Sequence, residues 1–462
     1  MLIQKETAHD VIAYAISLGA DFCELFIEKT SVQNISFSSK KIKDISSGID
    51  SGIGLRLIYG EMALYAYSNS TKKEDLLDMV KKLTAQFKNK NRSDSLKTFN
   101  FTPLEYKVIT AVPSKDATLT QKIEAITKLD NLVRSKSSLI SQATIGLIQK
   151  EQKVEIYNSE GLNAFEIRPY IRFSADVIAS EGSEQASAYM APGRRGGFKF
   201  IEDLNFEEMA ETATKQAITI LRAKPCPAGA MPVVIENGFG GVIFHEACGH
   251  LLETTSVETK SSVLWDKKGE LVAHPVLSAV DDGTQDNLWG SLSIDDEGMQ
   301  TQKTQLIKNG ILTNFISDKI GNIKTGHPRT GSGRRQNYRF APASRMRNTY
   351  IDQGTSTLDE MLQSMGDGLY CATMGGGSVN PGTGEFNFSV NEGYLVKNGK
   401  IQHAIKGATL IGKGEEILKR ISMVGNNLEF TAGMCGSVSG SIPTTVGQPT
   451  IKVDEILVGG QI

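Results

Sequence analysis

The chain has 462 residues, of which 40% are hydrophobic, 22% charged and 7% aromatic. This composition is typical of a folded protein of two or three domains, and it excludes a disordered chain or a small disulfide-stabilised scaffold. The 50 Lys and Arg residues nearly balance the 52 Asp and Glu residues, so no overall charge attracts nucleic acid or an anionic membrane. We expect neither as a partner.

The N-terminus and the cysteines indicate the compartment. The apolar stretch at residues 11–20 is too short to span a bilayer, and Glu6, His9 and Asp10 precede it where a signal peptide carries basic residues. The five cysteines are odd in number and widely spaced, which is typical of reduced thiols. We therefore expect a cytoplasmic protein.

The first half, residues 1–225, is predicted to be an α+β domain with an antiparallel meander. Apolar residues at three- and four-residue intervals predict helices at 6–18, 73–87, 118–135 and 206–223. Alternating β-rich runs between residues 22 and 67 predict the meander, and a hairpin over 153–179 turns at 158–161. Two prolines and a glycine in residues 224–229 predict a linker.

The second half, residues 229–462, is predicted to be a mostly antiparallel β domain that carries one buried helix. A strand at 231–236 turns at Asn237 and Gly238 into an apolar helix at 241–252. Short β-like runs predict strands at 304–309, 349–352, 385–390, 393–397 and 451–457. The other predicted helices span 358–365 and 415–424. The whole chain is therefore predicted to be α+β.

The buried helix contains a His-Glu pair, His245 and Glu246, followed by His250. In zinc hydrolases, two imidazoles of such a helix bind the metal and the carboxylate takes a proton from bound water. These histidines are five residues apart instead of four, which places them about 140° apart on an ideal α-helix. A π-bulge, tolerated at Gly249, would return both to one face and make this a metal-binding helix. The alternative is a chance His-Glu string on a buried helix.

Ordered sequence blocks continue after this motif through the second half. They include HEACGH (245–250), VDDGT (280–284), GSGRR (331–335), GGGSV (375–379), CGSVSGSIP (435–443) and VGQPT (446–450). Together these blocks resemble the TldD branch of the TldD/PmbA family of metalloproteases. The first half resembles the family only in its pattern of helices and strands. The paired PmbA/TldE branch lacks the His-Glu motif.

The resemblance implies a zinc-dependent peptidase that hydrolyses unfolded or extended peptides. It implies one Zn²⁺ per chain bound by His245, His250 and Cys435, with Glu246 as the general base. Flanking glycines also let the loop of Cys435 approach an ion closely. Cys248 is expected to face away from both histidines as a small buried residue. The family also implies a dimer, formed with a second copy or with a motif-lacking paralogue.

Further candidates for substrate binding lie outside the motif. A polar segment contains His327, Arg334, Arg335 and Tyr338. These residues can bind a peptide carboxylate or an oxyanion, or they can form a solvated basic loop. The glycine run consists of Gly375, Gly376 and Gly377. It can admit an extended substrate backbone beside a strand, or it can be a tight turn.

Other carboxylates are weaker candidates for metal binding. Glu253 lies three residues after His250, and a surface carboxylate is the favoured interpretation over a ligand or a residue that supports one. Two acidic pairs, at 281–282 and 295–296, favour turns and strand ends over a cation site.

Two other functions are alternatives to the peptidase. Residues 407–413 nearly match a phosphate-binding loop, but Gly414 follows where a Ser or Thr must bind magnesium. A non-catalytic regulatory or scaffold subunit of a TldD/PmbA-type complex is the other alternative, and the intact motif argues against it. Metal content separates this role from the catalytic one.

Overall fold

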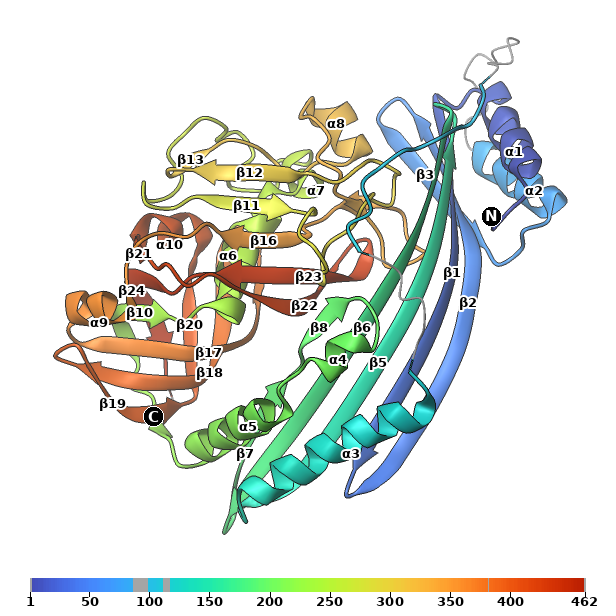
Figure 1. The fold of residues 1–462 in the computed structure, drawn as a ribbon. Helices are drawn as coiled ribbons and strands as arrows, with labels where there is room; N and C mark the ends of the chain where they lie inside the picture. Colours follow the sequence, from blue (N-terminus) through green and yellow to red (C-terminus); the bar gives the residue numbers. More distant parts are fainter. Residues whose placement is uncertain (1, 86–98, 111–116, 381, 461–462) are drawn as a thin grey trace.

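The computed structural model describes residues 2–85, 99–110, 117–380 and 382–460. The predicted α+β class is confirmed (Figure 1). One large sheet occupies the first half, with the order β3-β2-β1-β5-β6-β4 and with β7 and β8 beside β6. Its strands are β1 (Phe22–Ser38), β2 (Lys41–Tyr59), β3 (Met62–Ser68), β4 (Thr102–Pro103), β5 (Ile140–Asn158), β6 (Leu162–Glu181), β7 (Glu184–Met190) and β8 (Gly193–Arg195).

The predicted meander and hairpin are confirmed as long antiparallel strands. The β5–β6 turn forms because Asn158 Oδ1 accepts the backbone N–H groups of Glu160 and Leu162, and Gly161 adopts φ +87°. The helices of this half are α1 (Lys5–Ser17), α2 (Lys73–Thr84), α3 (Leu119–Lys136), α4 (Lys199–Glu202) and α5 (Phe206–Leu221). The end of the helix predicted at 73–87 lies outside the described residues.

Helices α3 and α5 cover one face of the large sheet, whereas α1 and α2 lie at one end of it (Figure 1). Apolar side chains such as Ile126, Leu129 and Val133 on α3 are fully buried against the sheet. The opposite face of the same sheet meets the second half of the chain.

The second half contains two larger sheets. One of them closes on itself, because β17 pairs with both β10 and β18. Its strands are β9 (Lys224–Pro225), β10 (Gly229–Ile235), β17 (Gly368–Val379), β18 (Glu385–Lys397), β19 (Lys400–Lys406), β20 (Ala408–Lys413), β21 (Ile421–Val424) and β24 (Ile451–Gly459). The predicted linker contains β9, which pairs in parallel with β19. The alternative of a phosphate-binding loop at 407–413 is wrong, since these residues form β20, antiparallel to β18 and β24.

A second sheet of this half has the strand order β13-β12-β11-β16-β23-β22, and its edge strand β22 carries Cys435. Its strands are β11 (Ala279–Asp282), β12 (Lys303–Lys308), β13 (Ile311–Leu312), β16 (Asn348–Ile351), β22 (Glu429–Ser437) and β23 (Gly440–Gln448), and a small ladder pairs β14 (Gly333–Arg334) with β15 (Ala343–Ser344). The helical segments are η1 (Gly238–Gly241), α6 (Val242–Ala247), η2 (Gly249–Leu252), α7 (Thr254–Val257), α8 (Lys319–Thr325), α9 (Leu358–Met365) and α10 (Gly414–Arg420).

The two halves meet through buried ion pairs. Arg56 on β2 donates to Glu24 (Nη2–Oε2 2.7 Å) and to Glu297 (Nη1–Oε1 2.6 Å). Arg335 donates to the other oxygen of Glu24 (Nη2–Oε1 2.7 Å). All four side chains are buried, and the Arg56–Glu297 and Arg335–Glu24 pairs cross between the two halves, so these charges favour this relative orientation.

None of the helices in the described residues has the length and apolar character to span a lipid bilayer.

Candidate metal centre

The helix that carries the His-Glu motif breaks between its two histidines. Helix α6 ends at Ala247, Cys248 adopts φ −133° and ψ −47°, and the 3₁₀ turn η2 begins at Gly249. The predicted π-bulge is therefore wrong, because the backbone changes direction at Cys248 instead of widening by one residue. A Cβ atom at Gly249 would overlap the sulfur of Met346, so any larger residue here would displace the Met346 side chain.

This break and strand β22 bring His245, His250 and Cys435 together. Nε2 of each histidine lies 3.3 Å from the Sγ atom of Cys435. The three candidate ligand atoms lie within 4.8 Å of one another. Tetrahedral Zn²⁺ with ordinary Zn–N and Zn–S bonds places N and S about 3.6 Å apart. The donor set and its spacing therefore fit a zinc ion.

Electrostatics favour the ligand form of the cysteine. Burial raises the pKa of Cys435, but the imidazoles of His245 and His250 outweigh this effect and lower the pKa to about 4. For His250 burial acts in the opposite direction and lowers the pKa. The charges of Glu253 and Cys435 outweigh this effect and hold the pKa of His250 well above its ordinary value. A thiolate is the form that binds a metal, so the cysteine is prepared for binding.

Glu246 lies beside the three ligands without joining them. Its Oε2 atom is 3.8 Å from Nε2 of His250, and its side chain keeps 18% exposure while His245 is buried. Burial is the main cause of a raised pKa for this carboxyl. A glutamate with a raised pKa is a better proton acceptor than an ordinary surface carboxylate.

Glu253 is not the surface carboxylate favoured from the sequence. Its side chain is 3% exposed, and Oε2 lies 2.9 Å from Nδ1 of His250, opposite the ring nitrogen that faces Cys435. Burial raises the pKa of this carboxyl, but His250 and Arg345 bring it below its ordinary value. It supports a candidate ligand instead of facing solvent.

Cys248 is fully buried and belongs to the apolar core that surrounds α6. Burial raises the pKa of its thiol, and the cluster of candidate ligands does not include it. Its expected role as a small buried residue agrees with this position. Cys23, Cys226 and Cys371 are buried and free as well.

The polar segment proposed for substrate contact is largely buried. Arg334 is 3% exposed and donates to the carbonyls of Met346 and Pro443. Tyr338 is fully buried against the first half, where its backbone N–H donates to Glu28. His327 packs against Phe315, with ring centroids 4.5 Å apart. Arg334 and Tyr338 are therefore buried and occupied by contacts within the protein, which does not favour substrate binding by them, whereas substrate contact by the partly buried His327 stays a prediction.

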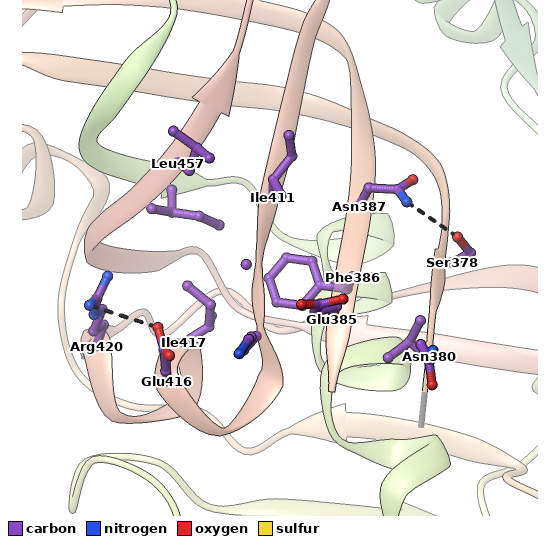
Figure 2. Close-up of a pocket in the computed structure, with 14 residues that line it drawn as sticks. Ser378, Asn380, Glu385, Phe386, Asn387, Ile411, Glu416, Ile417, Arg420 and Leu457 are labelled. Atoms are coloured by element: carbon purple, nitrogen blue, oxygen red, sulfur yellow. Dashed lines mark hydrogen bonds and ion pairs between the residues drawn. The ribbon is translucent and has the colours of Figure 1, made fainter. Parts of the chain in front are cut away.

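The glycine run lies inside strand β17, so the alternative of a tight turn is wrong. Gly377 pairs with Phe388 of β18, and a Cβ at Gly376 would meet open space. The next residues, Ser378 to Asn380, form one wall of a cavity of about 680 Å³ (Figure 2). The other walls come from β18, β20, α10 and β24, and the lining includes no residue of the metal centre.

Arg345 is a residue of the site that sequence reasoning missed. It is fully buried, and its Nη2 donates to the carbonyl of Cys435 at 2.6 Å. Nothing in the sequence around residue 345 gives a reason to single it out. Its contribution depends on a fold that joins distant segments.

Two imidazoles and one thiolate beside a carboxylate outside their cluster form a donor set that can hold a metal ion. Family models describe the same chain as PmbA/TldA metallopeptidase domain 1 over residues 23–86, the central domain over 112–221 and the C-terminal domain over 228–460. The chain belongs to the PmbA/TldD family of metallopeptidases, which confirms the resemblance found in the sequence.

Individual relatives cover almost the whole chain. The chain is 36% identical to the metalloprotease TldD homolog of Haemophilus influenzae over 95% of its own length and 93% of that protein. It is 26% identical to the zinc metalloprotease TldD homolog of Saccharolobus solfataricus, over 98% and 99% of the two chains. Family membership therefore extends over both halves of the chain.

Solved structures share the fold at low sequence identity. A putative modulator of a DNA gyrase from Thermotoga maritima has a TM-score of 0.79 and 20% identity, covering 98% of this chain and 100% of that one. TldE from Thermococcus kodakarensis has a TM-score of 0.77 and 20% identity over the same shares. At this identity the likeness shows the fold alone.

Proposed function

We propose that this chain is a zinc-dependent peptidase that hydrolyses unfolded or extended peptides. The observation that carries the proposal is the convergence of His245, His250 and Cys435 beside Glu246, which is not a member of the ligand cluster. The family's name and the relatives named metalloprotease support the same class. Free cysteines agree with a cytoplasmic location, which we propose as well.

The residues divide into ligands and a base. His245, His250 and Cys435 would hold one Zn²⁺, which supplies a water of lowered pKa and polarises the scissile carbonyl. Glu246 accepts the proton of the attacking nucleophile and returns it to the leaving amine. Burial of the site excludes bulk water and strengthens these charge interactions.

Zinc removal is the direct test of this proposal. The purified protein should contain about one zinc per chain by mass spectrometry and should cleave a short unstructured peptide. A chelator should abolish cleavage and added zinc should restore it, because three protein ligands suit this ion. Protein without stoichiometric metal, whose cleavage ignores the chelator, would contradict the peptidase proposal. Absence of both metal and cleavage would favour the regulatory or scaffold role.

We also propose that the chain forms a dimer, with itself or with a motif-lacking paralogue. Strand β3 pairs with β2 from Ile53 onward, and among the described residues no strand pairs with the outer edge of β2 over residues 41–52. Ile42, Ile45 and Ile49 on this segment are 42%, 40% and 70% exposed. A long edge strand with exposed isoleucines is a typical site for pairing with another chain.

Light scattering at micromolar concentration tests the dimer. The homodimer should show twice the chain mass of 50.1 kDa. Ile49→Lys should shift this mass towards the monomer, because a charge on the edge opposes strand pairing. Ile148→Lys is the matched control, since Ile148 is also an exposed isoleucine, at 47%, but lies on β5 between β1 and β6, away from the edge. A monomer that pairs with neither a second copy nor a paralogue would refute the proposal.

A further inference from the structure

The metal centre is built from two pieces of chain that are far apart in sequence. His250 lies on η2, whereas Cys435 lies on β22, 185 residues later. The two ligands already lie 3.3 Å apart in the protein alone. Protein contacts must therefore hold the two segments together, because a site assembled only by its ion would not be preformed. The buried residues behind the ligands show which contacts these are.

We propose that Glu253 and Arg345 form a positioning bridge that orients His250 and Cys435 at the same time. The inference rests on the proposed metal site, and it assigns a role to two residues that are not members of the ligand cluster. Glu253 is 3% exposed and Arg345 is fully buried. Between them they contact both ligand-bearing segments.

Glu253 fixes the ring of His250. Its Oε2 lies 2.9 Å from Nδ1 of the imidazole, and its Oε1 accepts the backbone N–H of Met346 at 3.2 Å. A carboxylate that accepts from Nδ1–H selects the tautomer whose Nε2 carries the lone pair, the atom that faces Cys435. No such partner is seen for His245, whose Nδ1 has no hydrogen-bond partner among the described residues.

Arg345 fixes the segment of Cys435. Its Nη2 donates to the Cys435 carbonyl at 2.6 Å, and its Nη1 donates to Oγ of Ser439 and to the carbonyl of Gly440, each at 2.9 Å. The guanidinium thus spans the hairpin between β22 and β23. Its Nε atom lies 3.9 Å from Oε1 of Glu253, so the two halves of the bridge meet as a buried ion pair without a hydrogen bond between these two atoms.

Zinc affinity is the measurement that separates positioning from general stability. Glu253→Gln preserves the volume of the side chain but removes its charge, and it should weaken zinc binding about 10- to 100-fold in a competition titration with a chromophoric chelator. Arg345→Lys should weaken it as well, because an ammonium cannot span three carbonyl and hydroxyl acceptors in the same geometry. In the double variant the two losses should be less than additive, since both act on one bridge.

Glu166→Gln is the matched control. Glu166 is also a 3% exposed glutamate between arginines, with Arg168 at 2.8 Å and Arg195 at 3.1 Å, but it lies in the large sheet. This control should reduce stability to unfolding and leave zinc affinity unchanged. The cobalt-substituted protein adds a spectroscopic readout, because Arg345→Lys should alter the thiolate-to-cobalt charge-transfer band, whereas Glu166→Gln should not.

The outcomes distinguish this inference from the proposed activity. Wild-type zinc affinity in both Glu253→Gln and Arg345→Lys would overturn the bridge and leave the peptidase proposal standing. Weakened binding in these variants, in a protein that cleaves no peptide, would support the bridge and contradict the peptidase. If Glu253→Gln does not fold, Arg345→Lys decides by the same two measurements. A wild-type chain that binds no zinc would overturn both proposals.

Discussion

Cys435→Ser should lower zinc affinity at least 100-fold and abolish peptide cleavage. Zinc in small sites is bound with about 10–16 kcal/mol shared among four ligands, so one ligand contributes roughly 3 kcal/mol, or a factor of 100. The loss should be larger for this cysteine, whose pKa two imidazoles lower to about 4 after burial has raised it. A serine hydroxyl remains protonated at neutral pH and cannot replace the thiolate. Equilibrium dialysis and peptide hydrolysis measure the two effects.

Cys248→Ser is the control for this substitution, because it makes the same atomic change within the motif itself. The Cys248 thiol is fully buried in the apolar core, and its sulfur is not part of the ligand cluster. A hydroxyl there should reduce the free energy of unfolding by about 1–3 kcal/mol, because it is buried without an assured partner. Zinc affinity should stay close to that of the wild type. If Cys248 were needed for zinc and Cys435 dispensable, the ligand set would be wrong.

The sequence predicted those parts of the site that a local pattern encodes. His245, Glu246 and His250 stand out because their residue types and spacing approach a known metal-binding arrangement. The shape of the helix between them did not follow from that pattern. At the break the backbone leaves the helix at Cys248, and Gly249 packs against Met346, a residue far away in the sequence that no local pattern indicates.

Burial of polar residues was the feature least visible in the sequence. Glu253 resembles a surface residue until the fold places Arg345 and Met346 against it. Tyr338 resembles part of a solvated loop, yet Glu28 of the first half accepts its backbone N–H. Local composition predicts exposure for such residues, and only tertiary contacts supply the partners that make burial favourable.

The long strands were predicted with more success than the small ones. Short alternating or β-rich runs predicted β1 to β3 and the part of the β5–β6 hairpin nearest its turn, because one face of the sheet is apolar and the other meets the charged interface. The hairpin was predicted from residue 153 onward, whereas β5 begins at Ile140. In the second half, the runs at 385–390 and 393–397 form one strand, β18. Its register shifts interrupt the alternation that a continuous strand would show.

Glu246→Gln should retain zinc and lose 10²- to 10⁴-fold in turnover. The glutamine is isosteric and uncharged, and the carboxylate it replaces is not among the three atoms that converge on the site. Its removal takes away the proton acceptor, whose contribution to catalysis falls in this range. The measurements are zinc content by mass spectrometry and kcat for an unstructured peptide.

Glu258→Gln makes the same chemical change a short distance along the chain. Glu258 follows α7, is 13% exposed and pairs with Lys324 at 2.8 Å, so it belongs to the same neighbourhood but touches none of the candidate ligands. The turnover and zinc content of the Glu258→Gln variant should match those of the wild type within about a factor of two. Near-normal turnover in Glu246→Gln would remove this residue from the mechanism. Loss of zinc in that variant would instead make Glu246 a ligand, because an acceptor that only takes a proton leaves the affinity of the ion unchanged.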